Sequence, residues 1–78
     1  MTQKVIGEAE FQSMPVDRQL HILHSDGVYV SKRPLGDKHI VLFQLNTFYV
    51  EVYYQDYRME VEKILTCTQT DILDKYPL

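Results

Sequence analysis

Two histidines on one predicted helix are the first residues whose spacing could support chemistry. His21 and His24 lie three positions apart, a spacing that can place both imidazoles on one side of a metal ion. Two ligands do not complete a site, although Glu10 or Asp17 could add a carboxylate. Because the sequence has no HExxH pattern and only one cysteine, solvated histidines on a helix surface are the simpler explanation. We therefore expect no metal and no cofactor.

Cys67 is the single cysteine of the chain. A thiol acts as a nucleophile only beside a base and an oxyanion site, and the sequence assigns neither, so a buried structural thiol at a strand end is the simpler explanation. One cysteine excludes an intramolecular disulfide, which favours a reducing compartment. The first ten residues lack an apolar run of signal-peptide length, and no run is long enough to span a bilayer. We therefore expect a cytoplasmic protein without a membrane partner.

Acidic and aromatic residues alternate in the second half of the chain. Glu51, Glu60 and Glu62 can gather on one side of a sheet, and paired carboxylates can act as acid and base when their pKa values differ. A solvated acidic strip is the plainer explanation. The six tyrosines invite comparison with proteins that stack single-stranded nucleic acid on aromatic rings. However, the net charge is −3, and Tyr49 and Tyr53 flank a glutamate, so we expect no nucleic acid.

Composition and length indicate one globular domain over residues 1–78. Hydrophobic residues make up 45% of the chain and charged residues 24%, which is ordinary for a globular protein. We interpret residues 1–12 as an arm that is either flexible or packed on the rest. A helix is predicted from Ser13, a capping residue, and Pro15, which tolerates an early helical position. It should end near His24 or Ser25, because Gly27 can adopt a positive φ. Its apolar stripe comprises Val16, Leu20 and Leu23.

From Val28 the apolar period changes to two, which predicts strands. A turn is predicted over Arg33–Lys38, where proline and glycine occur together, and a two-residue loop at Asn46-Thr47. The predicted fold is therefore α+β: an N-terminal helix, a four-stranded antiparallel meander and a short C-terminal helix. The later strands are predicted at residues 39–45, 48–54 and 58–66, and the last helix follows Thr68, with Ile72, Leu73 and Tyr76 on its apolar side.

The register of the predicted strands separates two apolar faces. If Leu45 pairs with Phe48, one side of the sheet carries Val41, Phe43, Val50 and Val52, which we call the core face. Pairing Arg33 with Lys38 would add Val28 and Val30 to the core face, and the last strand would add Met59 beside Val52 and Val61 beside Val50. Beyond that point the alternation slips, which predicts a β-bulge near Glu62-Lys63.

The opposite side of the sheet, which we call the second face, is also apolar. It is predicted to carry Tyr29, Ile40, Leu42, Tyr49, Glu51 and Tyr53. A large exposed apolar patch usually marks an interface. We therefore predict a non-enzymatic interaction domain without catalytic residues, in which these six residues bind a protein partner or a second copy in a homodimer.

Two alternatives to that interface are open. The second face could be covered within the chain, either by the C-terminal helix or by the arm that contains Val5, Ile6 and Phe11. A small-ligand or hydrolytic site could instead lie between the sheet and the termini, using His39, Tyr54 or Cys67. His39 and Tyr54 are predicted to be cross-strand neighbours on the core face, so a hydrogen-bonded pair at the rim of the sheet is the simpler explanation for them.

One resemblance accompanies this pattern. The run Phe48–Tyr54, together with Gly27–Val30, Ile64-Leu65 and Asp71–Tyr76, resembles small bacterial proteins of unknown function. The resemblance spans residues 11–78 and contains no catalytic motif. It implies only that the chain is a stand-alone domain.

Overall fold

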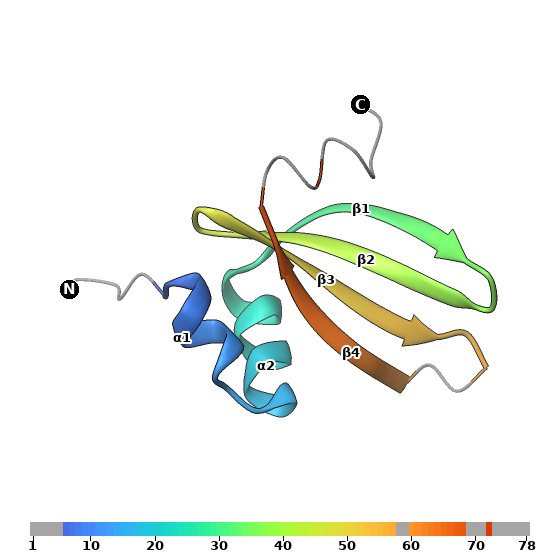
Figure 1. Cartoon of the computed structure of the whole chain (residues 1–78), viewed down its shortest axis with the longest axis horizontal. Coiled ribbons are helices and arrows are strands. Elements are labelled where there is room, and N and C mark those ends of the chain that lie inside the picture. Colours follow the sequence, from blue (N-terminus) through green and yellow to red (C-terminus); the bar gives the residue numbers. More distant parts are fainter. Residues whose placement is uncertain (1–5, 58–59, 69–71, 73–78) are drawn as a thin grey trace.

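In the part of the chain that the structure describes, two helices are followed by a four-stranded antiparallel sheet (Figure 1). The computed structural model describes residues 6–57, 60–68 and 72. The strands lie in chain order, β1-β2-β3-β4, so the predicted α+β meander with an N-terminal helix is confirmed. No helix among these residues is long and apolar enough to cross a membrane. The elements are α1 (Glu8–Gln12), α2 (Val16–Asp26), β1 (Val28–Leu35), β2 (Lys38–Leu45), β3 (Phe48–Gln55) and β4 (Glu60–Cys67).

The central hairpin of β2 and β3 has the predicted register. Leu45 pairs with Phe48, and His39 pairs with Tyr54 at the far end. The connecting turn is tight because Asn46 adopts a positive φ of 58°, a conformation that asparagine tolerates better than most residues. The alternation of side chains along this hairpin therefore fixes both faces of the sheet.

The first hairpin differs from its prediction. Leu35, not Arg33, pairs with Lys38, so β1 is two residues longer than expected. Pro34 was interpreted as a turn residue, yet an edge strand tolerates proline because it need not donate a hydrogen bond on its outer side. Gly36 alone provides the positive φ, at 62°, and the turn needs only two residues.

A β-bulge in β1 reverses the faces of its first residues. Tyr29 pairs with Phe43 and Ser31 pairs with Leu42, which leaves Val30 as the extra residue. A shift of two residues at the turn keeps every side chain on its face, but one extra residue moves the preceding side chains to the opposite face. The predictions that Tyr29 lies on the second face and Val28 on the core face are therefore wrong.

The bulge predicted in β4 is confirmed. Tyr53 pairs with Lys63 and Tyr54 pairs with Val61, so Glu62 is the extra residue. The predicted partner of Val61 is wrong, because it lies opposite Tyr54 at the end of the sheet. The predicted positions of Val5, Met59, Leu73 and Tyr76 fall outside the described residues, as does the predicted C-terminal helix apart from Thr68 and Ile72.

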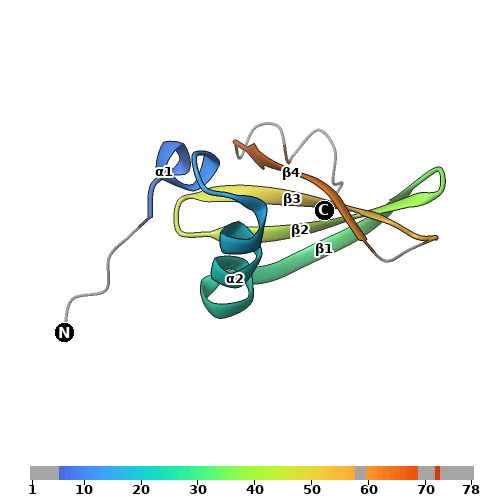
Figure 2. The same ribbon diagram turned by 90° about the horizontal axis from the view of Figure 1, so that it is seen from below.

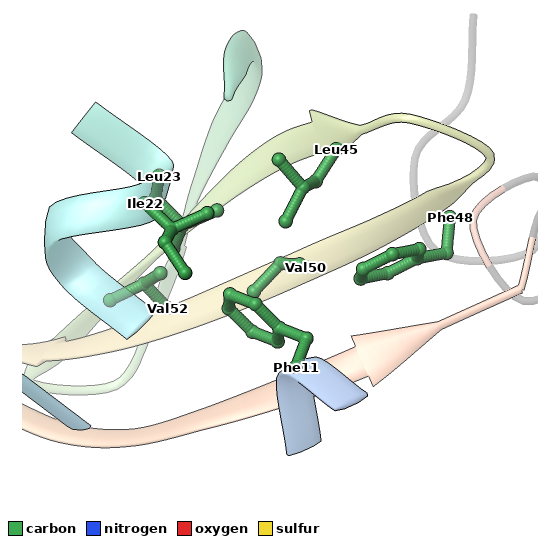
Figure 3. Close-up of a cluster of buried hydrophobic side chains, with 7 residues drawn as sticks. All are labelled: Phe11, Ile22, Leu23, Leu45, Phe48, Val50 and Val52. Atoms are coloured by element: carbon green, nitrogen blue, oxygen red, sulfur yellow. The ribbon is translucent and has the colours of Figure 1, made fainter. Parts of the chain in front are cut away.

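Both helices pack on the core face at one end of the sheet. Views from two directions show α1 and α2 against the end that contains the β2–β3 turn, whereas neither helix covers the end with the other two turns (Figures 1 and 2). Figure 3 shows the apolar cluster between helices and sheet, which comprises Phe11, Ile22, Leu23, Leu45, Phe48, Val50 and Val52. The end of the core face with the other two turns, which we call the open end, is therefore not covered by a helix.

The buried stripe of α2 is rotated from the predicted one. Leu23 is buried and Leu20 packs against the core, as expected, but Val16 is 45% exposed. Ile22 and Gln19 are buried in its place. The Gln19 amide donates to the Phe11 carbonyl at 2.8 Å, so this buried polar group is satisfied and connects the two helices.

The ends of α2 also differ from their predictions. Ser13 does not cap α2, because its hydroxyl donates to the Glu10 carbonyl and ends α1. α2 begins after Pro15 without a side-chain cap. Gly27 has a φ of −75°, so the expected positive φ is wrong. Glycine is needed there for space, since a Cβ would lie 2.6 Å from the Leu23 carbonyl oxygen.

Candidate functional site

The open end of the core face contains a groove with a volume of about 620 Å³. Its lining combines one aliphatic side chain with four polar ones that differ in charge. The lining residues are Lys32, His39, Val41, Tyr54 and Asp56. This volume is within the range of sites that bind small molecules.

The strand register brings the groove residues together from three strands and a turn. Lys32 of β1 pairs with Val41 of β2, and His39 of β2 pairs with Tyr54 of β3. Asp56 follows β3 directly, and its backbone N–H donates to the Asp37 carbonyl of the first turn at 3.1 Å. This bond joins the two turns at the open end and fixes the backbone of Asp56 beside the histidine.

His39 and Asp56 form a hydrogen bond between Nδ1 and Oδ1. A carboxylate on one ring nitrogen sets the orientation of an imidazole and leaves Nε2 to donate or accept. The two side chains are 40% and 38% exposed, so they are within reach of a solute. Lys32 adds a cation to this pair and Tyr54 a hydroxyl, and the lining can therefore bind an acidic group next to an apolar body.

The second face holds a different polar cluster, centred on Glu51, whose exposed fraction is 0%. Its Oε2 accepts a hydrogen bond from Arg33 at 3.3 Å, and its Oε1 accepts one from the Cys67 thiol at 3.2 Å. A thiol that donates carries its proton, so this geometry does not present a thiolate nucleophile. The cluster joins β1, β3 and β4 at the centre of the sheet.

The residues predicted as an interaction surface are largely covered within this chain. Ile40, Leu42, Glu51 and Tyr53 are all at most 8% exposed. Tyr49 is half-buried.

Cover of the second face comes partly from Ile72, which is buried against Leu42 and Cys67, while the ammonium of Lys63 lies 4.7 Å from the ring centre of Tyr53. Covering by the N-terminal arm, the other alternative, is wrong for Phe11, which lies on the core face. The use of this face for binding stays a prediction.

Glu51 and Glu62, which were considered as an acid–base set, have separate cationic partners. Glu62 accepts a hydrogen bond from Lys38 at 2.9 Å, on the same side of the sheet as Glu51 but at its open end. This hydrogen bond lowers the pKa of Glu62 below its ordinary value and raises that of Lys38. The acidic strip is therefore partly an ion-pair strip.

We expect Glu62→Gln to lower the free energy of unfolding at neutral pH and to have no effect in strong acid. The pKa of Glu62 is lower in the folded state than its ordinary value of 4.5. The pair therefore stabilises the fold at pH values above 4.5, and this contribution is lost as the pH falls through the pKa of the folded state. The effect should be small, since the side chains of Lys38 and Glu62 are 33% and 27% exposed, so water screens the pair. Urea denaturation at pH 7 and at pH 2.5 measures it, with Glu60→Gln as the control. A difference that persists at low pH would contradict the assignment.

The remaining candidates are not brought together. His21 and His24 are exposed on α2, which contributes no residue to the lining of the groove. Cys67 pairs with Tyr49 on the second face, whereas His39 lies on the core face. Among residues 6–57, 60–68 and 72, no group of three His, Cys, Asp or Glu residues could hold a metal ion. Comparisons with protein-family models, curated proteins and solved structures give no match.

Proposed function

We propose that the groove on the core face binds a small molecule that carries an acidic group. The observation that supports this most is the position of the His39–Asp56 pair at the groove, beside the cation Lys32. Val41 would contact the apolar body of the ligand. Lys32 and His39 would face its acidic group from neighbouring strands.

Charge explains why an acidic ligand is favoured over a cation. The whole chain has a net charge of −3, so an anion needs local positive groups to overcome general repulsion. Lys32 supplies this positive charge. The single carboxylate in the lining, Asp56, is already engaged by His39 and is less available to repel the ligand.

Binding is expected to raise the stability of the native state. A panel of small aliphatic and aromatic carboxylic acids and phosphate monoesters, each beside its neutral amide or alcohol, would be screened by thermal denaturation. A ligand present at a hundred times its Kd should add about 2.7 kcal/mol. Acids that stabilise while their neutral counterparts do not would support the proposal.

Variants locate the site and provide the control. We expect His39→Asn to weaken binding about tenfold, which corresponds to about 1.4 kcal/mol, and Lys32→Met to act in the same direction. His21→Asn removes an exposed helix histidine and should leave Kd unchanged. A ligand that binds both histidine variants equally well would place its site elsewhere, and stabilisation by none of the acids would overturn the proposal.

The interaction domain predicted from the second face is a separate proposal. Its central residues, Leu42 and Glu51, are fully buried, so a partner on this face would have to displace Ile72, which packs against Leu42. The groove needs no such rearrangement, and for this reason we favour it.

A further inference from the structure

Asp56 determines which ring nitrogen of His39 carries the proton. The bond between the two side chains joins Nδ1 to Oδ1. An ionised carboxylate can only accept a hydrogen bond, so the proton lies on Nδ1. In a neutral imidazole the other nitrogen, Nε2, then has a free lone pair and acts as an acceptor. Because His39 lines the groove, it offers a ligand an acceptor rather than a donor.

The carboxylate that orients His39 is itself held in place by the backbone. The N–H of Asp56 donates to the Asp37 carbonyl at 3.1 Å, which connects the turn after β3 to the turn after β1. The Asp56 side chain therefore starts from a fixed position beside β2. A ligand that meets a preoriented acceptor loses less binding free energy to the ordering of the site.

Two hydrogen-bond donors lie next to this acceptor. The direct partner of Lys32 is Val41, which is two residues from His39 along β2, so Lys32 and His39 are diagonal neighbours. Such neighbours lie about 7 to 8 Å apart at their backbones, a gap that one end of a small ligand can bridge. Tyr54 lies directly opposite His39, and its hydroxyl can also donate. The lining therefore combines donors for an acid with an acceptor beside them.

A simple carboxylic acid matches the donors of the groove but not the acceptor, because an ionised carboxylate has no proton to donate to Nε2. We propose, on the basis of the acid binding proposed above, that the groove selects α-hydroxy acids. The carboxylate of the ligand would bind Lys32, and the hydroxyl on the neighbouring carbon would donate to Nε2 of His39. Both groups belong to the same end of the ligand, which leaves its apolar remainder for Val41.

An α-amino acid also has a donor on the neighbouring carbon, but its charge fits the groove less well. Its ammonium would lie next to the ammonium of Lys32, and like charges at close range repel. The zwitterion also has no net charge for Lys32 to attract. A neutral hydroxyl provides the donor without this repulsion, so the α-hydroxy acid is the favoured class.

Isothermal titration calorimetry at pH 8.5, above the range in which histidines usually change charge, tests the selectivity. The probes are mandelic acid, phenylacetic acid, which lacks the hydroxyl, and O-methylmandelic acid, whose ether oxygen cannot donate. Mandelic acid should bind about threefold to tenfold more tightly than the other two, the usual gain from one hydrogen bond. Phenylglycine, the matching amino acid, should bind more weakly than mandelic acid.

The outcomes distinguish this selectivity from acid binding as such. If phenylacetic acid binds as tightly as mandelic acid, the selectivity is wrong and acid binding stands. If phenylglycine binds more tightly than mandelic acid, the assigned ligand class is wrong. If neither mandelic nor phenylacetic acid binds, the selectivity is overturned, whereas the wider panel of acids still decides whether the groove binds acids at all.

Asp56→Asn tests the cause of the selectivity. An amide can accept from Nδ1 or donate to it, so this variant no longer fixes the proton on Nδ1. The preference for mandelic over O-methylmandelic acid should therefore fall by about threefold or more. Asp37→Asn is the matched control, because it removes the same charge from the facing turn and keeps the bond between Asp56 and His39. It should leave the preference unchanged.

Nitrogen NMR of the imidazole rings reads the position of the proton without any ligand. In the wild-type chain at pH 8.5 the proton of His39 should lie on Nδ1, whereas Asp56→Asn should show a mixture of both tautomers. The spectrum of His39→Asn identifies the His39 signals by their loss. A wild-type ring with its proton on Nε2, or a preference that Asp56→Asn leaves unchanged, would overturn the proposal.

Discussion

Phe11→Ala is expected to lower the free energy of unfolding by about 3 to 5 kcal/mol, the usual loss for truncating a buried aromatic side chain. Phe11 has an exposed fraction of 0%, and its ring lies 5.8 Å from that of Phe48, centre to centre. The helix that carries it has only five residues, too few to be stable alone. Removing the ring should therefore release α1 as well.

This loss is a large share of the total stability. A chain of 78 residues is expected to have an unfolding free energy of roughly 4 to 12 kcal/mol. Urea denaturation followed by circular dichroism measures the change. Val16→Ala truncates a half-exposed apolar residue of the next helix and should change stability by only about 0.5 kcal/mol. If Phe11→Ala cost no more than this control, α1 would not be packed on the sheet in solution.

Arg33→Met is expected to cost about 3 kcal/mol, near the lower end for breaking a buried ion pair. The carboxylate of Glu51 stays buried in this variant and loses a charged hydrogen bond that water cannot fully replace. The expected loss of unfolding free energy is at the low end of this range because the side chain of Arg33 is 26% exposed, so water can reach the pair from the Arg33 side.

The double variant Arg33→Met/Glu51→Leu separates the ion pair from packing. Replacing both charges by apolar side chains of similar size removes the buried carboxylate, so the double variant should be more stable than Arg33→Met alone. A double-mutant cycle from urea denaturation gives the coupling energy. Lys32→Met, next in the chain but on the other face, is the control and should have little effect. Additive losses in the cycle would show that Arg33 and Glu51 do not act as a pair.

The central hairpin could be predicted because two local signals agree there. Asn46-Thr47 provides one short loop, and the apolar alternation on both sides permits one register only. The bulge in β4 could be predicted for a similar reason, since Lys63 would otherwise point into the core. In the β2–β3 hairpin and at the β4 bulge, the type of each residue indicates the face of the sheet on which it lies.

β1 could be predicted only in part, because its determinants are not local. Pro34 is compatible with either a turn or an edge strand, and the choice depends on which side of the strand has a neighbour. The extra residue at Val30 leaves no trace in an apolar run such as Val28–Val30, where every position could face the core. Tyr29 was placed on the wrong face as a result.

The groove and the Glu51 cluster could likewise be predicted only where their residues lie on the central hairpin. The pairing of His39 with Tyr54 was predicted, because both belong to the central hairpin. Lys32 and Asp56 were missed, since one depends on the register of β1 and the other on a turn. Glu51 was correctly placed at the centre of the second face, but its salt bridge to Arg33 requires the observed length of β1.

The strand order has a consequence for the cooperativity of folding. Each strand pairs with the one that precedes it in the chain, so every hairpin closes a short loop at low entropic cost. Glu51 differs, because its partners Arg33 and Cys67 come from the first and the last strand. A partly formed sheet would leave this carboxylate without one of them. The buried charge therefore couples β1 to β4, two strands that are not neighbours, and favours a sheet that forms and unfolds as one unit.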